Sequence, residues 1–476
     1  MKHIVLIIFL GFYAVNFIQA TTWQVGQSRQ YTKPSQLSTL VKDGDTVNID
    51  AGVYTADAAH WTAKNLLLQG VGGLAHLQSN GQNWGGKAIW VIGGDNTKVA
   101  FIEFSECKVP DGNGAGIRLE SANLTVHGCY FHDNENGILA GDNPVSDILI
   151  EYSEFSNNGK GDGYTHNLYI NHVRSLTFQY NYSHHAKVGH ELKSRAYTNY
   201  ILYNRLSNEA DGTASREIDL PNGGTAVIMG NEIHQGTNGE NSNIIGYGQE
   251  GLLNPPPHQL YVVNNTIVNE RTTGSFLALR DGTELCYIHN NIFAGDGSIK
   301  VGTAFSNDIA YNWNGTIANA KFIDSKSYDY HLQATSPAVN TGETSSISVN
   351  GLSLVPKNEY RHPVNITFRI VVGTIDIGAH ENNTPSGIDE SKVIGSSFVY
   401  PNPTTGNCTI CIPDELNDNP TIDIMDIPGK VLYTITIVGS QGVLQLNQSL
   451  FTTSGLYFIR ISSKLKQKLL QLIITE

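Results

Sequence analysis

The chain has 476 residues, of which 40 % are hydrophobic and only 15 % are charged, and it contains 48 Gly and 22 Tyr. Its formal net charge of −13 gives no electrostatic support for a nucleic-acid partner. The length allows a large core and more than one domain, and the frequent Val, Ile, Tyr, Asn and Gly favour an all-β chain of short strands and turns.

The first twenty residues have the pattern of a secretory signal peptide. Lys2 and His3 form a charged start, an apolar run follows, and Ala20 ends a plausible cleavage site. No later segment is apolar for long enough to span a bilayer. We therefore expect residues 1–20 to be removed and the protein to be secreted or attached to the cell surface, without a transmembrane segment and as a monomer.

A small polar residue recurs behind short apolar runs at intervals of 21 to 34 residues. Such a period predicts a solenoid of stacked coils. We expect each interior asparagine to hydrogen-bond its counterparts in the coils above and below, with its own backbone in the left-handed region at a tight corner. Cys107 is expected to stack on Cys129 in this ladder, either in a disulfide or as a buried thiol. The ladder comprises Cys129, Ser153, Asn181, Asn204, Asn231, Asn265, Asn291 and Asn312.

Two groups of strings flank this ladder. DGDTVNIDAGVY (43–54) resembles the first coil of bacterial right-handed parallel β-helices, and FIDSKSYDYHLQATSPAVNTG (322–342) with DIGAHE (376–381) resembles their closing segment. The resemblance implies a right-handed parallel β-helix domain over residues 21–381. The polar stretch after it is typical of a linker, which we place at residues 382–395.

The C-terminal part has a different pattern. PNPTTG (401–406), DIPGK (426–430) and SGLYF (454–458) occur in this order between alternating apolar segments. This arrangement resembles the C-terminal sorting domain of the type IX secretion system of Bacteroidetes. It implies a small β-sandwich over residues 396–476, with the type IX secretion machinery as a partner. An ordinary ligand-binding β-sandwich is the alternative.

Polar residues that alternate with apolar ones predict an outer face on three successive coils. If Leu168, Leu192 and Ile218 point inward, their neighbours point outward. Adjacent coils are about 4.8 Å apart, so one sugar would contact several of these side chains. The expected outer rows are Asn167, Glu191 and Glu217, then Tyr169, Lys193 and Asp219, then Asn171 and Arg195.

This set of side chains suits β-elimination or epimerisation at a uronic acid. Removing the proton at C5 requires the adjacent carboxylate to be neutralised, which Arg195, His190 or Asn167 would do. The base would be Lys193, deprotonated with the help of Arg195 and partial desolvation, or Tyr169 as phenolate. The candidates for the acid that protonates the leaving oxygen are Tyr169, His184 and His166. The expected catalytic residues are Lys193, Tyr169, Arg195 and His190, and the expected substrate-binding residues are Asn167, His166, Glu191, Glu217, Asp219, Arg216 and Tyr247.

Tyr169, Lys193 and Arg195 resemble, in type and in facing, the residues of β-helical polysaccharide lyases that act on alginate and related uronates. That resemblance implies a lyase that cleaves an acidic polysaccharide.

Three alternatives remain open. Glu191, Glu217 and Asp219 would provide the paired acids of a β-helical glycoside hydrolase. The same oxygens would also suit Ca²⁺, although Lys193 and Arg195 would repel a cation, so we expect a metal-free mechanism without a cofactor. Finally, the charged rows would also suit a glycan-binding surface protein without activity.

Overall fold

In a computed structural model, the chain divides into two compact units, residues 1–384 and 385–476. The structure describes residues 20–371, 373–382, 398–400, 404, 406, 408–412, 416, 418–426, 430–437, 443–451, 453–463 and 466–475. The predicted signal peptide, apart from Ala20, and the predicted linker, apart from Asn382, lie outside the described residues. So do the PNP string and the centre of the DIPGK string.

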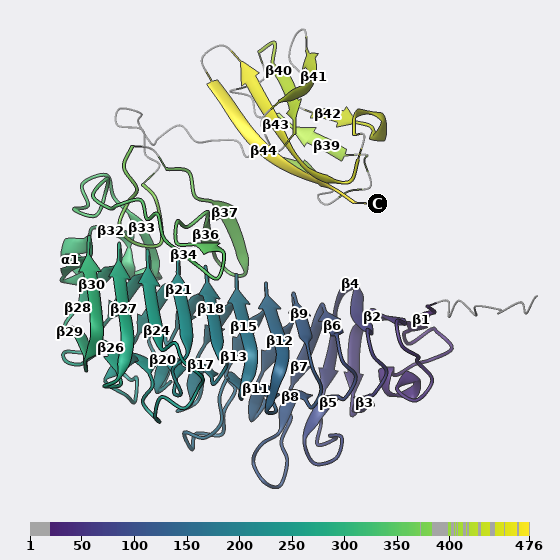
Figure 1. Ribbon diagram of the computed structural model, residues 1–476. Coiled ribbons are helices and arrows are strands. Elements are labelled where there is room, and N and C mark those ends of the chain that lie inside the picture. Colours follow the sequence, from purple (N-terminus) through teal and green to yellow (C-terminus); the bar gives the residue numbers. More distant parts are fainter. Residues whose placement is uncertain are drawn as a thin grey trace, which may run out of the picture. The chain divides into compact units, whose positions relative to one another are not determined.

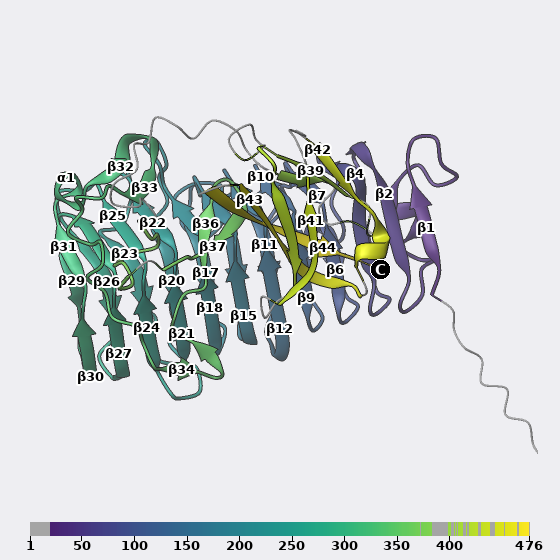
Figure 2. The same ribbon diagram turned by 90° about the horizontal axis from the view of Figure 1, so that it is seen from above.

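The first unit is a β-helix in which each coil contributes one strand to each of three faces, and every pairing between coils is parallel. The strands follow one another in order along a single axis (Figures 1 and 2). The first face contains β1 (Thr22–Val25), β2 (Thr46–Thr55), β4 (Leu67–Gln78), β6 (Thr97–Ala100), β9 (Leu124–His127), β12 (Asn143–Glu151), β15 (Val173–Gln179), β18 (Thr198–Leu202), β21 (Thr225–Met229), β24 (Gln259–Val263), β27 (Thr283–His289) and β30 (Ala304–Ala310).

The second face begins with the C-terminal halves of β2 and β4, which continue across the corner from the first face. Its other strands are β7 (Ile102–Ser105), β10 (Tyr130–His132), β13 (Glu154–Ser156), β16 (Tyr182–His184), β19 (Arg205–Ser207), β22 (Glu232–Gln235), β25 (Thr266–Asn269), β28 (Ile292–Gly295) and β31 (Trp313–Gly315). The third face contains β3 (Ala59–Trp61), β5 (Ala88–Ile92), β8 (Ala115–Leu119), β11 (Asn136–Ala140), β14 (Leu168–Ile170), β17 (His190–Ser194), β20 (Arg216–Leu220), β23 (Asn243–Tyr247), β26 (Ser275–Leu279) and β29 (Ser298–Val301).

The predicted asparagine ladder is confirmed at the corner between the first and second faces. Asn204 donates from Nδ2 to Oδ1 of Asn231 at 2.9 Å, and Asn231 donates in the same way to Asn265. The left-handed residue is not the asparagine itself, as expected, but the one before it, such as Tyr203 with φ of 54°. The residue before each asparagine makes the turn, and the asparagine side chain points into the core.

A second interior ladder lies at the corner between the second and third faces. Asn134 donates to Asn158, Asn158 donates to Asn167, and Asn167 donates to Oε2 of Glu191 at 2.5 Å. Cys107 belongs to this ladder, because its N–H donates to Oδ1 of Asn134. The expectation that Cys107 stacks on Cys129 is therefore wrong, since Cys129 lies in the first ladder, and both thiols are free and buried.

Apolar side chains fill the space between the faces. Phe104, Phe131 and Phe155 stack in successive coils with ring centroids 5.0 and 4.9 Å apart. All three are fully buried, as are Leu168 and Leu192, which were predicted to point inward. Burial of this apolar surface favours the coiled state, and the two polar ladders satisfy the backbone at its corners.

A closing segment follows the last coil and lies against the first two faces. Asn358 and Lys357 contact the hydroxyl groups of Tyr180 and Tyr203, and His380 binds Glu232. The segment contains α1 (Ile317–Ala320), β32 (Phe322–Asp324), the 3-10 turn η2 (Ser325–Ser327), β33 (Asp329–Leu332), β34 (Ser348–Val349), β35 (Leu352–Ser353), β36 (Asn358–Arg361) and β37 (Asn365–Phe368), and a 3-10 turn near the start of the chain, η1, spans Pro34–Leu37.

The second unit is a small antiparallel sandwich, as predicted. Two sheets, of three and four strands, share one buried core that includes Ile410, Ile424 and Ile459. The strands are β38 (Phe398–Tyr400), β39 (Cys408–Cys411), β40 (Thr421–Met425), β41 (Val431–Thr436), β42 (Val443–Leu446), β43 (Gly455–Ser463) and β44 (Lys466–Ile474), with the 3-10 turn η5 at Gln448–Leu450.

Candidate active site

A cleft of about 710 Å³ lies on the third face, over β8, β11, β14, β17 and β20. Its wall includes the loop that carries Tyr164, the side chain of which is 84 % exposed. Seven of the predicted site residues line the cleft: His166, Tyr169, His190, Lys193, Arg195, Arg216 and Asp219.

Of the three outer rows predicted from alternation, the one with Tyr169, Lys193 and Asp219 is confirmed. Tyr169 is paired in register with Lys193, and Lys193 with Asp219, on β14, β17 and β20. Arg118 and Leu139 continue this row on β8 and β11. Because successive strands of one face present the same row of side chains, these groups form a continuous strip along the floor of the cleft.

Lys193 lies between two carboxylates. Its Nζ is 2.8 Å from Oδ2 of Asp219 and 2.7 Å from Oε1 of Glu250. Asp219 is 1 % exposed and also contacts Nη1 of Arg216 at 3.2 Å and Nε2 of His190 at 3.5 Å. Lys193 is therefore in direct contact with two carboxylates at the floor of the cleft.

Arg195 contacts both Tyr169 and Glu250, and Glu250 in turn contacts Lys193. Its Nε donates to the phenol oxygen of Tyr169 at 3.0 Å, and its Nη2 donates to Oε2 of Glu250 at 2.5 Å. Nη1 donates to Oδ1 of Asn222 at 2.5 Å. Burial acts to lower the pKa of Arg195, but the hydrogen bonds to Glu250 and Tyr169 raise it overall.

Glu250 places one carboxylate across both cations. Burial acts to raise its pKa, but Lys193 and Arg195 outweigh that effect and lower it. The Glu250 side chain is 47 % exposed and comes from the turn after β23, so it can leave without disturbing the core. The sequence prediction assigned a substrate-binding role to Tyr247, whereas the nearby residue that reaches the cleft is Glu250.

Two neutral imidazoles complete the floor. The rings of His166 and His190 are stacked 4.9 Å apart, and each Nδ1 accepts a backbone N–H, from His190 and Arg216 respectively. The remaining proton of each ring is therefore on Nε2. Burial, then the nearby cations, lower the pKa of His190 well below its usual value, and burial does the same for His166. Both rings are neutral at neutral pH.

Four predicted substrate-binding residues do not reach the cleft. Asn167, Glu191 and Glu217 are fully buried and belong to the second polar ladder, where Oε1 of Glu191 accepts the N–H of Ala186. The outward assignment is wrong for Glu191 and Glu217 although both lie within strands, as the second residues of β17 and β20. Tyr247 is also fully buried and donates its hydroxyl to the carbonyl of Gly224 at 2.5 Å.

His184, a candidate acid, lies on the second face. It belongs to β16, and its Nε2 is 3.2 Å from Oε1 of Glu154. It is therefore not part of the cleft. Tyr164 and Arg118, in contrast, line the cleft but were not predicted. The glycine-rich stretch before Tyr164 predicts a loop and gives no sign of a binding role. Arg118 lies in an ordinary alternating strand pattern, which gives no such sign either.

Two protein families match parts of the chain. The family described as right handed beta helix region matches residues 51–214, and the secretion system C-terminal sorting domain matches residues 398–475. No curated protein sequence matches the chain. The crystal structure of pectate lyase Pel9A is similar over 77 % of this chain and 98 % of that one, with 14 % identity and a TM-score of 0.43. A similarity of this size does not assign an activity.

Within the described residues, no helix is long and apolar enough to cross a membrane. The sorting domain directs export by the type IX secretion system, to the medium or to the cell surface. The chain is thus an exported right-handed parallel β-helix protein with a type IX secretion sorting domain at its C-terminus.

Proposed function

We propose that the protein is a polysaccharide lyase that cleaves a uronate-containing glycan by β-elimination in the third-face cleft. The observation that carries this proposal is the position of the Glu250 carboxylate, which contacts Nζ of Lys193 at 2.7 Å and Nη2 of Arg195 at 2.5 Å. A substrate carboxylate that displaced Glu250 would meet the same two cations. Neutralising that carboxylate makes the proton on the adjacent C5 more acidic.

Tyr169 is the base in this scheme. Nζ of Lys193 is already engaged by the carboxylates of Asp219 and Glu250, whereas the phenol oxygen of Tyr169 accepts a hydrogen bond from Arg195 at 3.0 Å. A phenolate at this position removes the proton from C5, the electron pair forms the C4–C5 double bond, and the C4–O bond breaks. Lys193 and Arg195 compensate the negative charge that develops on the carboxylate.

Tyr169 also returns the proton to the leaving oxygen. His166 and His190 are neutral with their protons on Nε2, and a neutral imidazole is a poor acid. One residue performs both transfers only when the C5 hydrogen and the C4 oxygen lie on the same side of the sugar ring. The scheme therefore favours mannuronate or glucuronate, in which they do, over galacturonate, in which they do not.

A glycoside hydrolase has less support. Of its three candidate acids, Glu191 and Glu217 are buried in the second ladder. The third, Asp219, contacts Lys193, Arg216 and His190. These three positive or hydrogen-donating groups also oppose a Ca²⁺ ion at Asp219.

The proposal is tested by ultraviolet absorbance of the unsaturated product. The purified protein is incubated with alginate, hyaluronan, heparin-type glycans and pectate. We expect the signal to grow on one of the first three and to disappear in Tyr169→Phe and Lys193→Ala. Tyr130→Phe, which removes a hydroxyl from the second face, is the matched control and should keep the activity. Tight retention on a glycan without any product would indicate a binding protein and refute the lyase.

A further inference from the structure

A cluster of two histidines and one glutamate lies on the second face, on a different side of the coil from the cleft. His76, Glu103 and His132 come from β4, β7 and β10, three strands of successive coils. His76 and Glu103 are opposite each other in register, and His132 lies two positions further along its strand than Tyr130, the partner of Glu103. No part of the proposed lyase scheme uses these residues.

Their ligand atoms converge on one point. Nε2 of His132 is 3.0 Å and Nε2 of His76 is 3.4 Å from the same oxygen, Oε1 of Glu103. The three ligand atoms all lie within 4.8 Å of one another. Ligand atoms bound at about 2.0–2.2 Å around a tetrahedral metal ion lie about 3.3–3.6 Å apart, so both imidazole nitrogens are already at or slightly inside that distance from the Glu103 oxygen.

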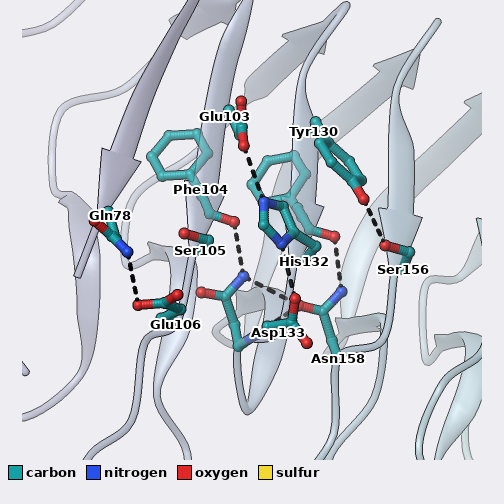
Figure 3. A network of polar contacts seen from close by, with 12 residues as sticks. Gln78, Glu103, Phe104, Ser105, Glu106, Tyr130, His132, Asp133, Ser156 and Asn158 are labelled. Atoms are coloured by element: carbon teal, nitrogen blue, oxygen red, sulfur yellow. Dashed lines mark hydrogen bonds and ion pairs between the residues drawn. The ribbon is translucent and has the colours of Figure 1, made fainter. Parts of the chain in front are cut away.

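Neighbouring groups fix the orientation of His132. Its Nδ1 is 2.9 Å from Oδ2 of Asp133, and Figure 3 shows this contact together with the one to Glu103. Tyr130 stacks on the same imidazole with centroids 4.4 Å apart. A carboxylate on Nδ1 keeps a proton there and directs the Nε2 lone pair toward Glu103, an arrangement common around metal-binding histidines.

The three side chains are mostly buried but remain accessible to solvent. The side chains of His76, Glu103 and His132 are 21, 21 and 19 % exposed. The two imidazoles select a transition metal over Ca²⁺ or Mg²⁺, and the open side leaves room for water as the remaining ligand.

We propose that His76, Glu103 and His132 bind one divalent transition metal ion of the zinc class. The ion would link three adjacent coils on the second face. Ser105, whose Oγ is 2.7 Å from Nε2 of His76, would orient that ring or bind a metal-bound water.

A second group of this type, His331, Glu359 and His380, is less suited to a metal. Within it, His380 is buried and donates from Nε2 to Oε1 of Glu232 at 2.7 Å. Burial alone would lower the pKa of His380, but Glu232 and Glu359 raise it to about 9. A metal would have to displace a proton that two carboxylates hold.

The test is a titration of the full chelator-treated protein with Zn²⁺ by calorimetry and with Co²⁺ by visible absorbance. We expect one equivalent to bind, with affinity reduced at least about 100-fold in His132→Ala and Glu103→Gln, and about 10- to 100-fold in Asp133→Asn. Glu103→Gln preserves the shape of the side chain and so guards against misfolding, which circular dichroism checks.

His127→Ala is the matched control, because His127 pairs with Glu151 on the first face and, among the described residues, belongs to no group of three candidate metal ligands. It should bind both ions like the wild type. The proposal is overturned if the wild-type protein binds neither ion, or if it binds them equally well after His132 and Glu103 are replaced.

Discussion

Glu191 is a fully buried carboxyl group in the second ladder, and its burial raises its pKa from 4.5 to about 8. Between these two values the folded chain keeps a proton that the unfolded chain has released. Because the unfolded state then binds fewer protons, the free energy of unfolding falls as the pH rises through this range. Glu191→Gln keeps the shape of the side chain and has no proton to lose.

The size of the effect follows from the shift. In this range the free energy of unfolding falls by about 1.4 kcal/mol for each pH unit. From about pH 5 to about pH 8, the wild type should therefore lose about 4 kcal/mol of stability relative to Glu191→Gln. Urea titrations followed by circular dichroism at several pH values measure this difference.

Asp147→Asn is the control for that series. The hydrogen bond from Arg174 lowers the pKa of Asp147, so this group stays ionised in both states over the same range and its difference from the wild type should be constant. If the wild type and Glu191→Gln showed the same pH dependence, Glu191 would not be buried as a neutral acid, and the assignment of this corner to the core would be refuted.

Three further predictions concern the cleft and the first ladder. Glu250→Gln should strengthen binding of an acidic oligosaccharide about 5-fold by calorimetry, because the substrate no longer competes with an internal carboxylate; weaker binding would contradict this. Tyr164→Ala should weaken the same binding about 5- to 10-fold if its exposed ring stacks on a sugar, and an unchanged affinity would exclude it. Asn231→Ala should destabilise the protein by about 3–5 kcal/mol in urea titrations, since it leaves buried groups of Asn204 and Asn265 unpaired, and a loss below about 1 kcal/mol would show that the ladder is not important.

The repeat pattern predicted the fold because a β-helix satisfies the same chemical need once per coil. Every coil must pair its corner amides, so Asn181, Asn204 and Asn231 recur where the chain turns. Strand alternation likewise placed Tyr169, Lys193 and Asp219 in one row, because each lies inside a regular strand.

The errors arose near the corners and in a loop. Glu191 and Glu217 are the second residues of β17 and β20, close to the corner with the second face, and their side chains are fully buried although alternation assigns them to the outside. Cys107 was assigned to the wrong ladder because the two ladders have similar periods. Glu250 reaches Lys193 from 57 residues further along the chain, and no local pattern indicates such a contact.

The mechanism is tested most directly by the masses of the products, measured by mass spectrometry. β-Elimination forms the two new sugar ends without adding water, so the masses of the two fragments should sum to that of the substrate, and the fragment with the C4–C5 double bond should be lighter than the hydrolysis product by the mass of one water molecule. Fragments with a saturated C4 end whose masses sum to the substrate plus one water molecule would show hydrolysis and contradict the assignment of Tyr169, Lys193 and Arg195 to a lyase site.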